Sequence, residues 1–423
     1  MTTQQQPTHS GTFELTPMQG RWMRKARQLA ETVLRPNAVE IDGSASFPRA
    51  NLEQLNRAGL LALTIPKDKG GVGADVGTVA LVLQEIAKGC ASTAMCAAMH
   101  YSTVPLVAAL AKGPQIERVL EPLIRGELLG ASATSEFGSG SRIWHSQGYA
   151  ERGPDGFRIT ADKSFVTSAG EADFYVAPVL ARKGAKSDDM SLFLIEREHC
   201  KVPPEGAWDA LGFRGTASSP MRFRDVRLPP DALLGDEGAG FTMIVCFHFP
   251  LYHVGLSALF IGIAEAALQD ALAFVQARDK GSKSPLGSTE LAQSHFGEMR
   301  IRLTQAKALL ARVAHLTDRA LRVMLEIAEI GMAEQITERL MKSDDFFLEV
   351  SALKAVATEC AIDVTNLAMR VCGGAAYKRG HPVERHYRDA RAGALMAPNN
   401  DSLRTLIGKH LLGYPFPWEE EPS

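Results

Sequence analysis

The sequence predicts an α+β protein that is mainly α, with a helical segment, a small β domain and a second helical segment in that order. Apolar residues recur at three- and four-residue spacing before about residue 130 and after about residue 238, as they do in helices. Between these segments, short alternating runs are separated by Gly, Pro, Asp and Ser, as in strands joined by turns. Because strands and helices are segregated, a doubly wound dinucleotide-binding fold is excluded.

Each segment has a characteristic run of residues. The N-terminal helical domain, residues 15–130, contains ALVLQEIAKGCASTAMCAAMH, and the middle β domain, residues 131–237, contains GFRITADKSFVTS and DFYVAPVLA. The C-terminal helical bundle, residues 238–413, contains ELAQSHFGEMRIRLTQAKALLARVAHL. Residues 1–14 and 414–423 are expected to be tails.

The composition excludes several kinds of partner. The formal net charge of the 423 residues is -2, which indicates neither a nucleic-acid partner nor a membrane surface. The six cysteines include no CxxC pair, so we predict reduced thiols, no metal site and a cytoplasmic protein. The opening MTTQQQPTHSG has no basic and apolar regions of a secretory signal.

One apolar stretch, residues 241–264, is nearly long enough to span a membrane. His248, Pro250 and His253 interrupt it, and no second apolar stretch of this kind accompanies it. We therefore expect a helix that is buried in an oligomer core or lines a pocket.

Two stretches of the β domain carry residues suited to a flavin. In residues 133–142 (ATSEFGSGSR), glycines permit close backbone approach and hydroxyls supply hydrogen bonds, although such a loop is more often a solvated turn. In residues 162–176 (DKSFVTSAGEADFYV), Phe165 has the shape to cover one face of a flavin while Thr167 and Ser168 donate to its ring atoms. The ordinary alternative is a hairpin with Phe165 in the core.

Two further stretches combine glycine with charge. In residues 212–229 (GFRGTASSPMRFRDVRLP), Arg214 could meet a phosphate or carboxylate, or lie on the wet face of a strand. In residues 371–391 (VCGGAAYKRGHPVERHYRDAR), Gly373 and Gly374 permit close approach beside charges that could equally form a structural network.

Taken in order, these stretches resemble the acyl-CoA dehydrogenase family, whose motifs run TEPGAGSD, WITNG, GxRxSxT and QxxGGxGYxxExPxERxxRDA. The corresponding segments here are SEFGSGSR (135–142), FVTSA (165–169), GFRGT (212–216) and RVCGGAAYKRGHPVERHYRDA (370–390). The resemblance covers roughly residues 17–413. It implies an acyl-CoA dehydrogenase-like fold in which FAD binds between subunits of a homotetramer or homodimer.

The resemblance also implies roles for particular residues. Residues expected at the isoalloxazine side are Thr134, Ser135, Ser141, Phe165 and Thr167. Gly373 and Gly374 would serve the FAD of a neighbouring subunit. Arg278 would contact its diphosphate, although the family's RxxFG reads Arg278-Asp-Lys-Gly here.

The family's chemistry needs a carboxylate that removes the α-proton of an acyl thioester while a hydride passes to the flavin. Its two usual positions fall at Ala397 and at about Tyr252, and neither residue is a carboxylate. Pro250 and His253 stand near the places where relatives that bind CoA often carry Asp and Arg. Substitute catalytic residues are Tyr252 itself, Asp401 and His253, with His248 and His100 as further histidines that are more often structural.

Three functions remain open at this point, in this order. The first is an FAD-dependent oxidoreductase that desaturates an acyl thioester with a non-standard base and passes electrons to a partner such as an electron-transferring flavoprotein. The second is a flavin-dependent monooxygenase acting on an aromatic or heteroatom substrate, with FAD or FMN supplied by a flavin reductase. The third is a non-catalytic partner subunit of a heteromeric flavoenzyme.

Overall fold

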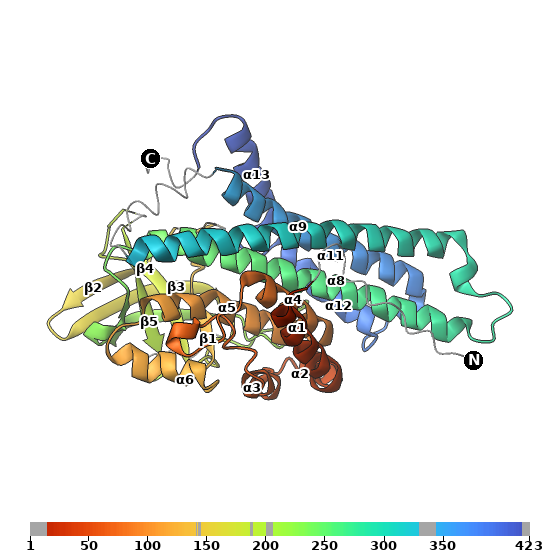
Figure 1. Cartoon of the computed structure of the whole chain (residues 1–423), viewed down its shortest axis with the longest axis horizontal. Coiled ribbons are helices and arrows are strands. Elements are labelled where there is room, and N and C mark those ends of the chain that lie inside the picture. The colour runs from red at the N-terminus through yellow and green to blue at the C-terminus, as the bar shows by residue number, and fades with distance from the viewer. Residues whose placement is uncertain are drawn as a thin grey trace.

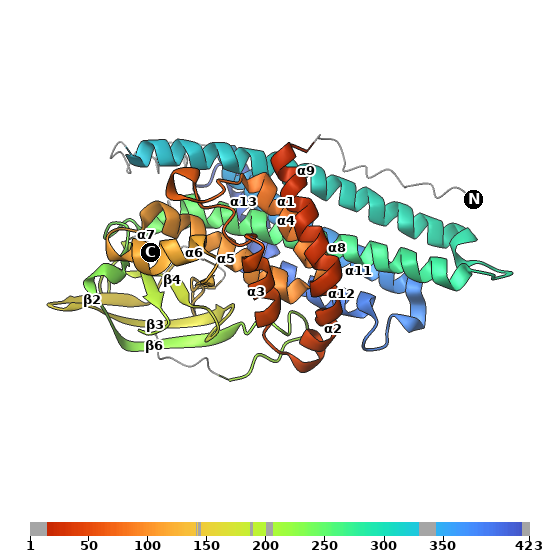
Figure 2. The same ribbon diagram turned by 60° about the horizontal axis from the view of Figure 1, so that its bottom comes forward.

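The computed structural model describes residues 15–416, apart from residues 141, 143–144, 187–188, 200–205 and 330–343. A twisted sheet lies at one end of the molecule, and the long C-terminal helices run from it toward the other end (Figures 1 and 2). The N-terminal helices pack along the side of these long helices. The helical, β and helical order expected from the sequence is confirmed.

The N-terminal segment is helical because local caps begin its helices and an apolar face buries them. Thr16 and Gln19 form a reciprocal capping box at the start of the first helix, and Asp75 accepts from the Thr78 amide at 2.6 Å to begin the fourth. The elements are α1 (Pro17–Leu29), η1 (Ala30–Leu34), α2 (Arg35–Ser44), α3 (Arg49–Arg57), η2 (Lys67–Lys69), α4 (Val76–Gly89), α5 (Ala91–Leu110), η3 (Ile116–Leu120) and α6 (Glu121–Ile124).

The sheet has the strand order β6-β3-β2-β4-β5-β7, and β1 pairs with β4 in parallel. Its strands are β1 (Gly130–Ser132), β2 (Tyr149–Gly153), β3 (Gly156–Val166), β4 (Phe174–Leu180), β5 (Met190–Glu196), β6 (Ser219–Leu228) and β7 (Leu233–Leu234), with η4 (Pro230–Ala232) before the last. All seven residues of β4 are buried, because α5 and α6 cover one face of the sheet and side chains of β3 and β6 join the core on the other. This explains why β4 reads as a continuous apolar run.

The C-terminal segment is organised around one central helix. Its elements are α7 (Gly240–Thr242), η5 (Met243–His248), α8 (Phe249–Asp279), η6 (Leu286–Ser288), α9 (Glu290–Glu329), α11 (Asp344–Cys372), η7 (Gly373–Ala375), α12 (Pro382–Arg391), η8 (Ala392–Ala394) and α13 (Asn400–Leu411). Helix α8 packs against α4, α5, α9, α11 and α12, so apolar residues surround it on all sides. Pro250 is tolerated because it lies in the first turn of α8.

Two helical stretches of the described chain are long and apolar enough to cross a membrane, Ala91–Leu110 and Gly240–Asp279, so the expectation that residues 241–264 have no second stretch of this kind beside them is wrong. Within the fold, 83% and 94% of their most apolar windows are buried. Their apolar character is therefore accounted for by the protein core. The second of them contains the stretch that the sequence predicts to be a buried helix.

Candidate functional site

The loop after β1 and the end of β3 come together at one edge of the sheet. The Ser164 amide donates to the Ser135 carbonyl at 2.9 Å, and the Phe137 amide donates to the Asp162 carbonyl at 3.2 Å. This pairing places Thr134 and Ser135 beside the segment that carries Phe165 and Thr167. Residues that the sequence assigned to one flavin are thus neighbours in the fold.

A buried ion pair holds the two segments together. Lys163 Nζ donates to Glu136 Oε1 at 2.6 Å and to the Pro178 carbonyl at 2.7 Å, and both charged side chains are almost fully buried. The second oxygen, Glu136 Oε2, accepts from the amides of Gln147 and Gly148 at 2.6 and 2.9 Å. Although burial alone would raise it, the Lys163 ammonium and these amides hold the pKa of Glu136 below its usual range. The pairing of Glu136 with Lys163 was not predicted from the sequence.

Beneath these segments lies a cluster of hydroxyl groups. Thr167 Oγ1 lies 3.0 Å from Ser218 Oγ, which lies 2.9 Å from Thr216 Oγ1. Ser168 adopts a left-handed conformation (φ 63°), and its amide donates to the Thr216 carbonyl at 2.9 Å. Its side-chain Oγ is buried and has no hydrogen-bond partner among the described residues. The Cys96 thiol of α5 interacts with this hydroxyl from the protein interior, so its use by a flavin stays a prediction.

The aromatic part of the site is open to solvent. The Phe165 ring is 62% exposed and meets Trp208 edge to face, with 6.4 Å between ring centroids. The alternative in which Phe165 lies in a hairpin core is therefore wrong. An exposed ring next to hydroxyl and amide donors fits the apolar face and polar edge of an isoalloxazine.

Other predicted flavin residues lie elsewhere. Ser141 is outside the described residues. Arg278 is exposed in the last turn of α8, and Gly373 and Gly374 are exposed in η7 directly after α11. Helices α8 and α11 end at the far end of the molecule from the sheet (Figures 1 and 2). One chain therefore does not bring these residues to the sheet edge, and their service to a neighbouring subunit's FAD stays a prediction.

Arg214 is engaged within the protein. Its Nε donates to the Asp42 carbonyl at 2.8 Å and its Nη1 to Asp209 Oδ1 at 2.8 Å. These contacts tie the 212–216 segment to α2. A structural role accounts for its hydrogen bonds.

Lys354 holds the segment that carries Ala397 in place through hydrogen bonds. The Lys354 ammonium is fully buried and donates to the carbonyls of Met396 and Pro398 at 3.0 and 2.9 Å, and to Asn400 Oδ1 at 3.0 Å. Burial lowers the pKa of Lys354 to about 7. The backbone at the usual base position is thus held firmly, but it presents only a methyl group.

The two histidines near the second base position are uncharged at neutral pH. His253 Nδ1 lies 2.7 Å from the Phe249 carbonyl, and burial lowers the pKa of His253 to about 3. His248 stacks on Tyr252 and lies between the Ser102 carbonyl and Ser132 Oγ, and burial lowers the pKa of His248 to about 4. The Nε2 of His253 has no partner among the described residues, but so low a pKa makes it a weak base. Burial also raises the pKa of Tyr252, so its hydroxyl stays protonated.

The last two candidates, His100 and Asp401, already have partners within the protein. Both ring nitrogens of His100 are used, since Nε2 lies 3.0 Å from the Leu61 carbonyl and Nδ1 accepts from the Gly130 amide at 2.9 Å. Asp401 lies in the first turn of α13, its side chain is 95% exposed, and it pairs with Arg404 at 3.2 Å.

A sheet domain between two helical domains, with a hydroxyl-rich edge that fits a flavin, defines a class of flavin oxidoreductases. Three family models cover the chain: "Acyl-CoA dehydrogenase, N-terminal domain" over residues 16–127, the middle domain over 131–226 and the C-terminal domain over 238–412. The chain belongs to the acyl-CoA dehydrogenase family, a family that binds FAD.

Three known proteins show how far the similarity extends. The chain is 30% identical over 407 residues to cyclohex-1-ene-1-carbonyl-CoA dehydrogenase of Syntrophus aciditrophicus, covering 94% of this chain and 91% of the relative. Butyryl-CoA dehydrogenase of Megasphaera elsdenii is 25% identical with a TM-score of 0.82, covering 95% of this chain and 100% of that one. Dibenzothiophene monooxygenase of Paenibacillus sp. A11-2 is 25% identical with a TM-score of 0.77, covering 94% and 98%.

Several residues of the site were not predicted from the sequence. Thr216 stood at the end of a recognised motif, so its position was marked without its role. Ser218 and Trp208 carried no such signal, and they reach the site only because the 206–218 segment folds back on the end of β3.

Proposed function

We propose that this protein is a flavin-dependent monooxygenase of the acyl-CoA dehydrogenase family, acting on an aromatic or heteroatom-containing substrate. The observation that carries the proposal is the loss of the proton-abstracting base. Ala397 and Tyr252 stand at the two usual positions. Among the substitutes, the histidines are buried with lowered pKa values, and Asp401 is exposed on α13 and pairs with Arg404. Oxygen insertion does not require an α-proton base, whereas desaturation of an acyl thioester does.

The bound flavin would supply electrons to molecular oxygen. The chain's own contribution would be to hold the ring. Phe165, Thr167 and Ser168 would position the ring from the sheet side. On the helical side, the uncharged side chains of His248, His253 and Tyr252 present no fixed charge to an apolar substrate.

The Paenibacillus monooxygenase supports this choice, because it has the same fold over nearly the whole chain. A structure of that protein with bound FMN also exists, so either FAD or FMN is a reasonable cofactor for this chain. A flavin reductase would then be the redox partner.

The proposal is tested by supplying reduced flavin under air. The purified chain is mixed with FAD or FMN, a flavin reductase and NADH, and a panel of aryl sulfides and N-heteroaromatics is screened for oxygenated products. Product formation that depends on the chain supports oxygenation and eliminates the non-catalytic subunit hypothesis. Complete bleaching of bound FAD by acyl thioesters without oxygen would instead support desaturation.

Desaturation is the second candidate, because the relatives include acyl-CoA dehydrogenases whose alignments cover more than 90% of the length of this chain. It would require a base from outside the residues considered above. Its redox partner would be an electron-transferring flavoprotein.

We also propose that the chain forms a homo-oligomer. Helix α13 projects away from the bundle (Figure 1), and Leu411 at its end and Leu412 directly after it are 75% and 78% exposed. Exposed apolar side chains on a projecting helix are typical of subunit contacts. Sedimentation velocity would measure the number of subunits.

A further inference from the structure

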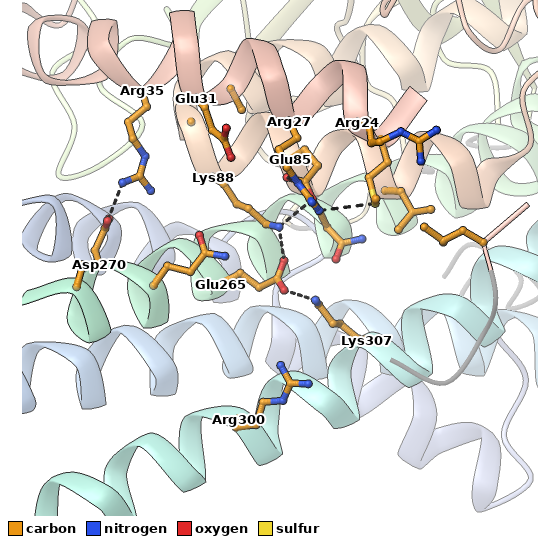
Figure 3. A pocket seen from close by; sticks show the side chains of 18 residues that line it. Arg24, Arg27, Glu31, Arg35, Glu85, Lys88, Glu265, Asp270, Arg300 and Lys307 are labelled. Atoms are coloured by element: carbon orange, nitrogen blue, oxygen red, sulfur yellow. Dashed lines mark hydrogen bonds and ion pairs between the residues drawn. The ribbon is translucent and has the colours of Figure 1, made fainter. Parts of the chain in front are cut away.

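A charged cavity lies between the N-terminal helices and the bundle, away from the sheet edge. It has a volume of about 830 Å³, within the range of small-molecule pockets. Its walls come from α1, η1, α4, α8 and α9, with Arg35 at the start of α2 (Figure 3). None of the residues assigned to the flavin or to the base lines it.

A chain of ion pairs crosses the cavity floor. Arg27 grips both oxygens of Glu85 at 3.0 and 3.2 Å, and Lys88 bridges Glu85 and Glu265 at 2.9 and 3.0 Å. Lys307 completes the chain by pairing with Glu265 (Figure 3). Although burial opposes ionisation, the two lysines hold the pKa of Glu265 below its usual range. Both buried carboxylates are thus already paired with cations of the protein.

The remaining charges of the cavity are unequal. Its lining holds six cations, Arg24, Arg27, Arg35, Lys88, Arg300 and Lys307, against four anions, Glu31, Glu85, Glu265 and Asp270, so 6 − 4 leaves a surplus of two positive charges. Asp270 is satisfied by Arg35 at 2.7 Å and by His386 at 2.9 Å. In the described part of the chain, Arg24 on α1 and Arg300 on α9 form no ion pair. Both residues are exposed, and the Arg24 guanidinium extends along α1, away from the ion pairs of the floor (Figure 3).

We propose that this cavity binds a compact anion with two or more negative charges on phosphate or carboxylate groups. A dianion neutralises the surplus, and a guanidinium group such as that of Arg300 on the α9 wall matches the paired oxygens of phosphates and carboxylates. The ion pairs on the floor fix the walls before the ligand arrives, which lowers the entropic cost of binding. This site is independent of the flavin chemistry proposed above.

The test uses the full chain saturated with FAD, so that the flavin's own diphosphate site is occupied. Inorganic pyrophosphate and citrate are titrated by calorimetry at constant ionic strength, with acetate as the monovalent comparison. The expected result is saturable binding of pyrophosphate, citrate or both, and no binding of acetate. Pyrophosphate alone would identify a phosphate ligand, and citrate alone a carboxylate ligand.

The variants decide whether the cavity is responsible. The double variant Arg24→Gln/Arg300→Gln should weaken binding at least tenfold, while Arg312→Gln, which removes an exposed cation of α9 outside the cavity, should leave it unchanged. Arg300→Gln alone serves if the double variant does not fold, with a smaller loss expected. Absence of binding, or equal binding to all variants, would overturn the proposal. So would a double variant that binds normally but changes its number of subunits, because this face would then be a subunit contact.

Discussion

The sheet edge and the helical side of the site have diverged to different degrees from the family pattern. At the sheet edge, hydroxyls, a buried Ser168 Oγ and an exposed Phe165 remain suited to a flavin. On the helical side, Ala397 occupies the base position and buried histidines surround Tyr252. If the flavin binds at the sheet edge as proposed, cofactor binding and proton abstraction lie on separate elements, so one can be lost while the other is kept.

The largest expected effect comes from the ion pair that holds the sheet edge together. Glu136→Gln leaves the Lys163 ammonium buried without its counter-charge, which should cost about 3–5 kcal/mol of unfolding free energy and reduce flavin content. Urea unfolding and the flavin absorbance of the purified protein measure both effects. Glu127→Gln, which breaks an exposed pair with Arg125, is the matched control and should lower the unfolding free energy far less. Equal losses in the two variants would show that the sheet edge does not depend on this pair.

The free energy of unfolding should fall in acid because three histidines are buried without charge. The folded pKa values of His100, His248 and His253 are about 4, 4 and 3, below the ordinary value of 6.5. The unfolded chain therefore takes up protons first as the pH falls below 6.5, and the folded state loses about 2 kcal/mol for each such histidine by pH 5. Thermal unfolding from pH 7 to pH 5 measures this loss.

Variants separate these histidines from other titrating groups. His248→Gln should remove one histidine's share of the pH dependence, whereas His315→Gln, at an exposed position of α9, should retain all of it. A slope that His248→Gln leaves unchanged would mean that the imidazole is protonated as readily inside the protein as outside.

The smallest expected effect concerns flavin affinity. Ser168→Ala removes a hydroxyl that interacts with the Cys96 thiol, a weak hydrogen-bonding group, and keeps the Cβ, so the stability of the flavin-free protein should change little. If the hydroxyl bonds the flavin, the dissociation constant should rise about fivefold, as for the loss of one hydrogen bond. Fluorescence titration with FAD measures this, with Ser288→Ala, in the distant η6, as the control. Unchanged affinity in Ser168→Ala would remove this residue from the flavin site.

The order of segments was predictable from sequence, because helical and alternating periods are local properties. Phe165, Thr167 and Ser168 could be predicted to lie together, since they follow one another at the end of β3, and their role toward a flavin stays a prediction. The pairing of Glu136 with Lys163 and the clamp of Lys354 on the Ala397 segment were not predictable. Both depend on contacts between residues 27 to 44 positions apart, which no local period records.

The proposed substitutes for the base show the same limit. Asp401 was chosen because it follows Ala397 by one helical turn, but α13 begins only at Asn400, so that spacing does not apply across the preceding loop. His253 was a candidate on the condition that a pocket opened toward it, and only the fold reveals that burial makes it a weak base.

The central claim is that the chain binds flavin but lacks the base for desaturation, and Ala397→Glu tests it most directly. The FAD-loaded wild type and variant are titrated without oxygen with acyl-CoA thioesters of increasing chain length, and flavin bleaching is followed. The account predicts no rapid bleaching of the wild type and a gain of at least about a hundredfold in the bleaching rate of Ala397→Glu with one or more thioesters, as expected for a restored base. Rapid bleaching of the wild type that the added carboxylate does not increase would contradict it.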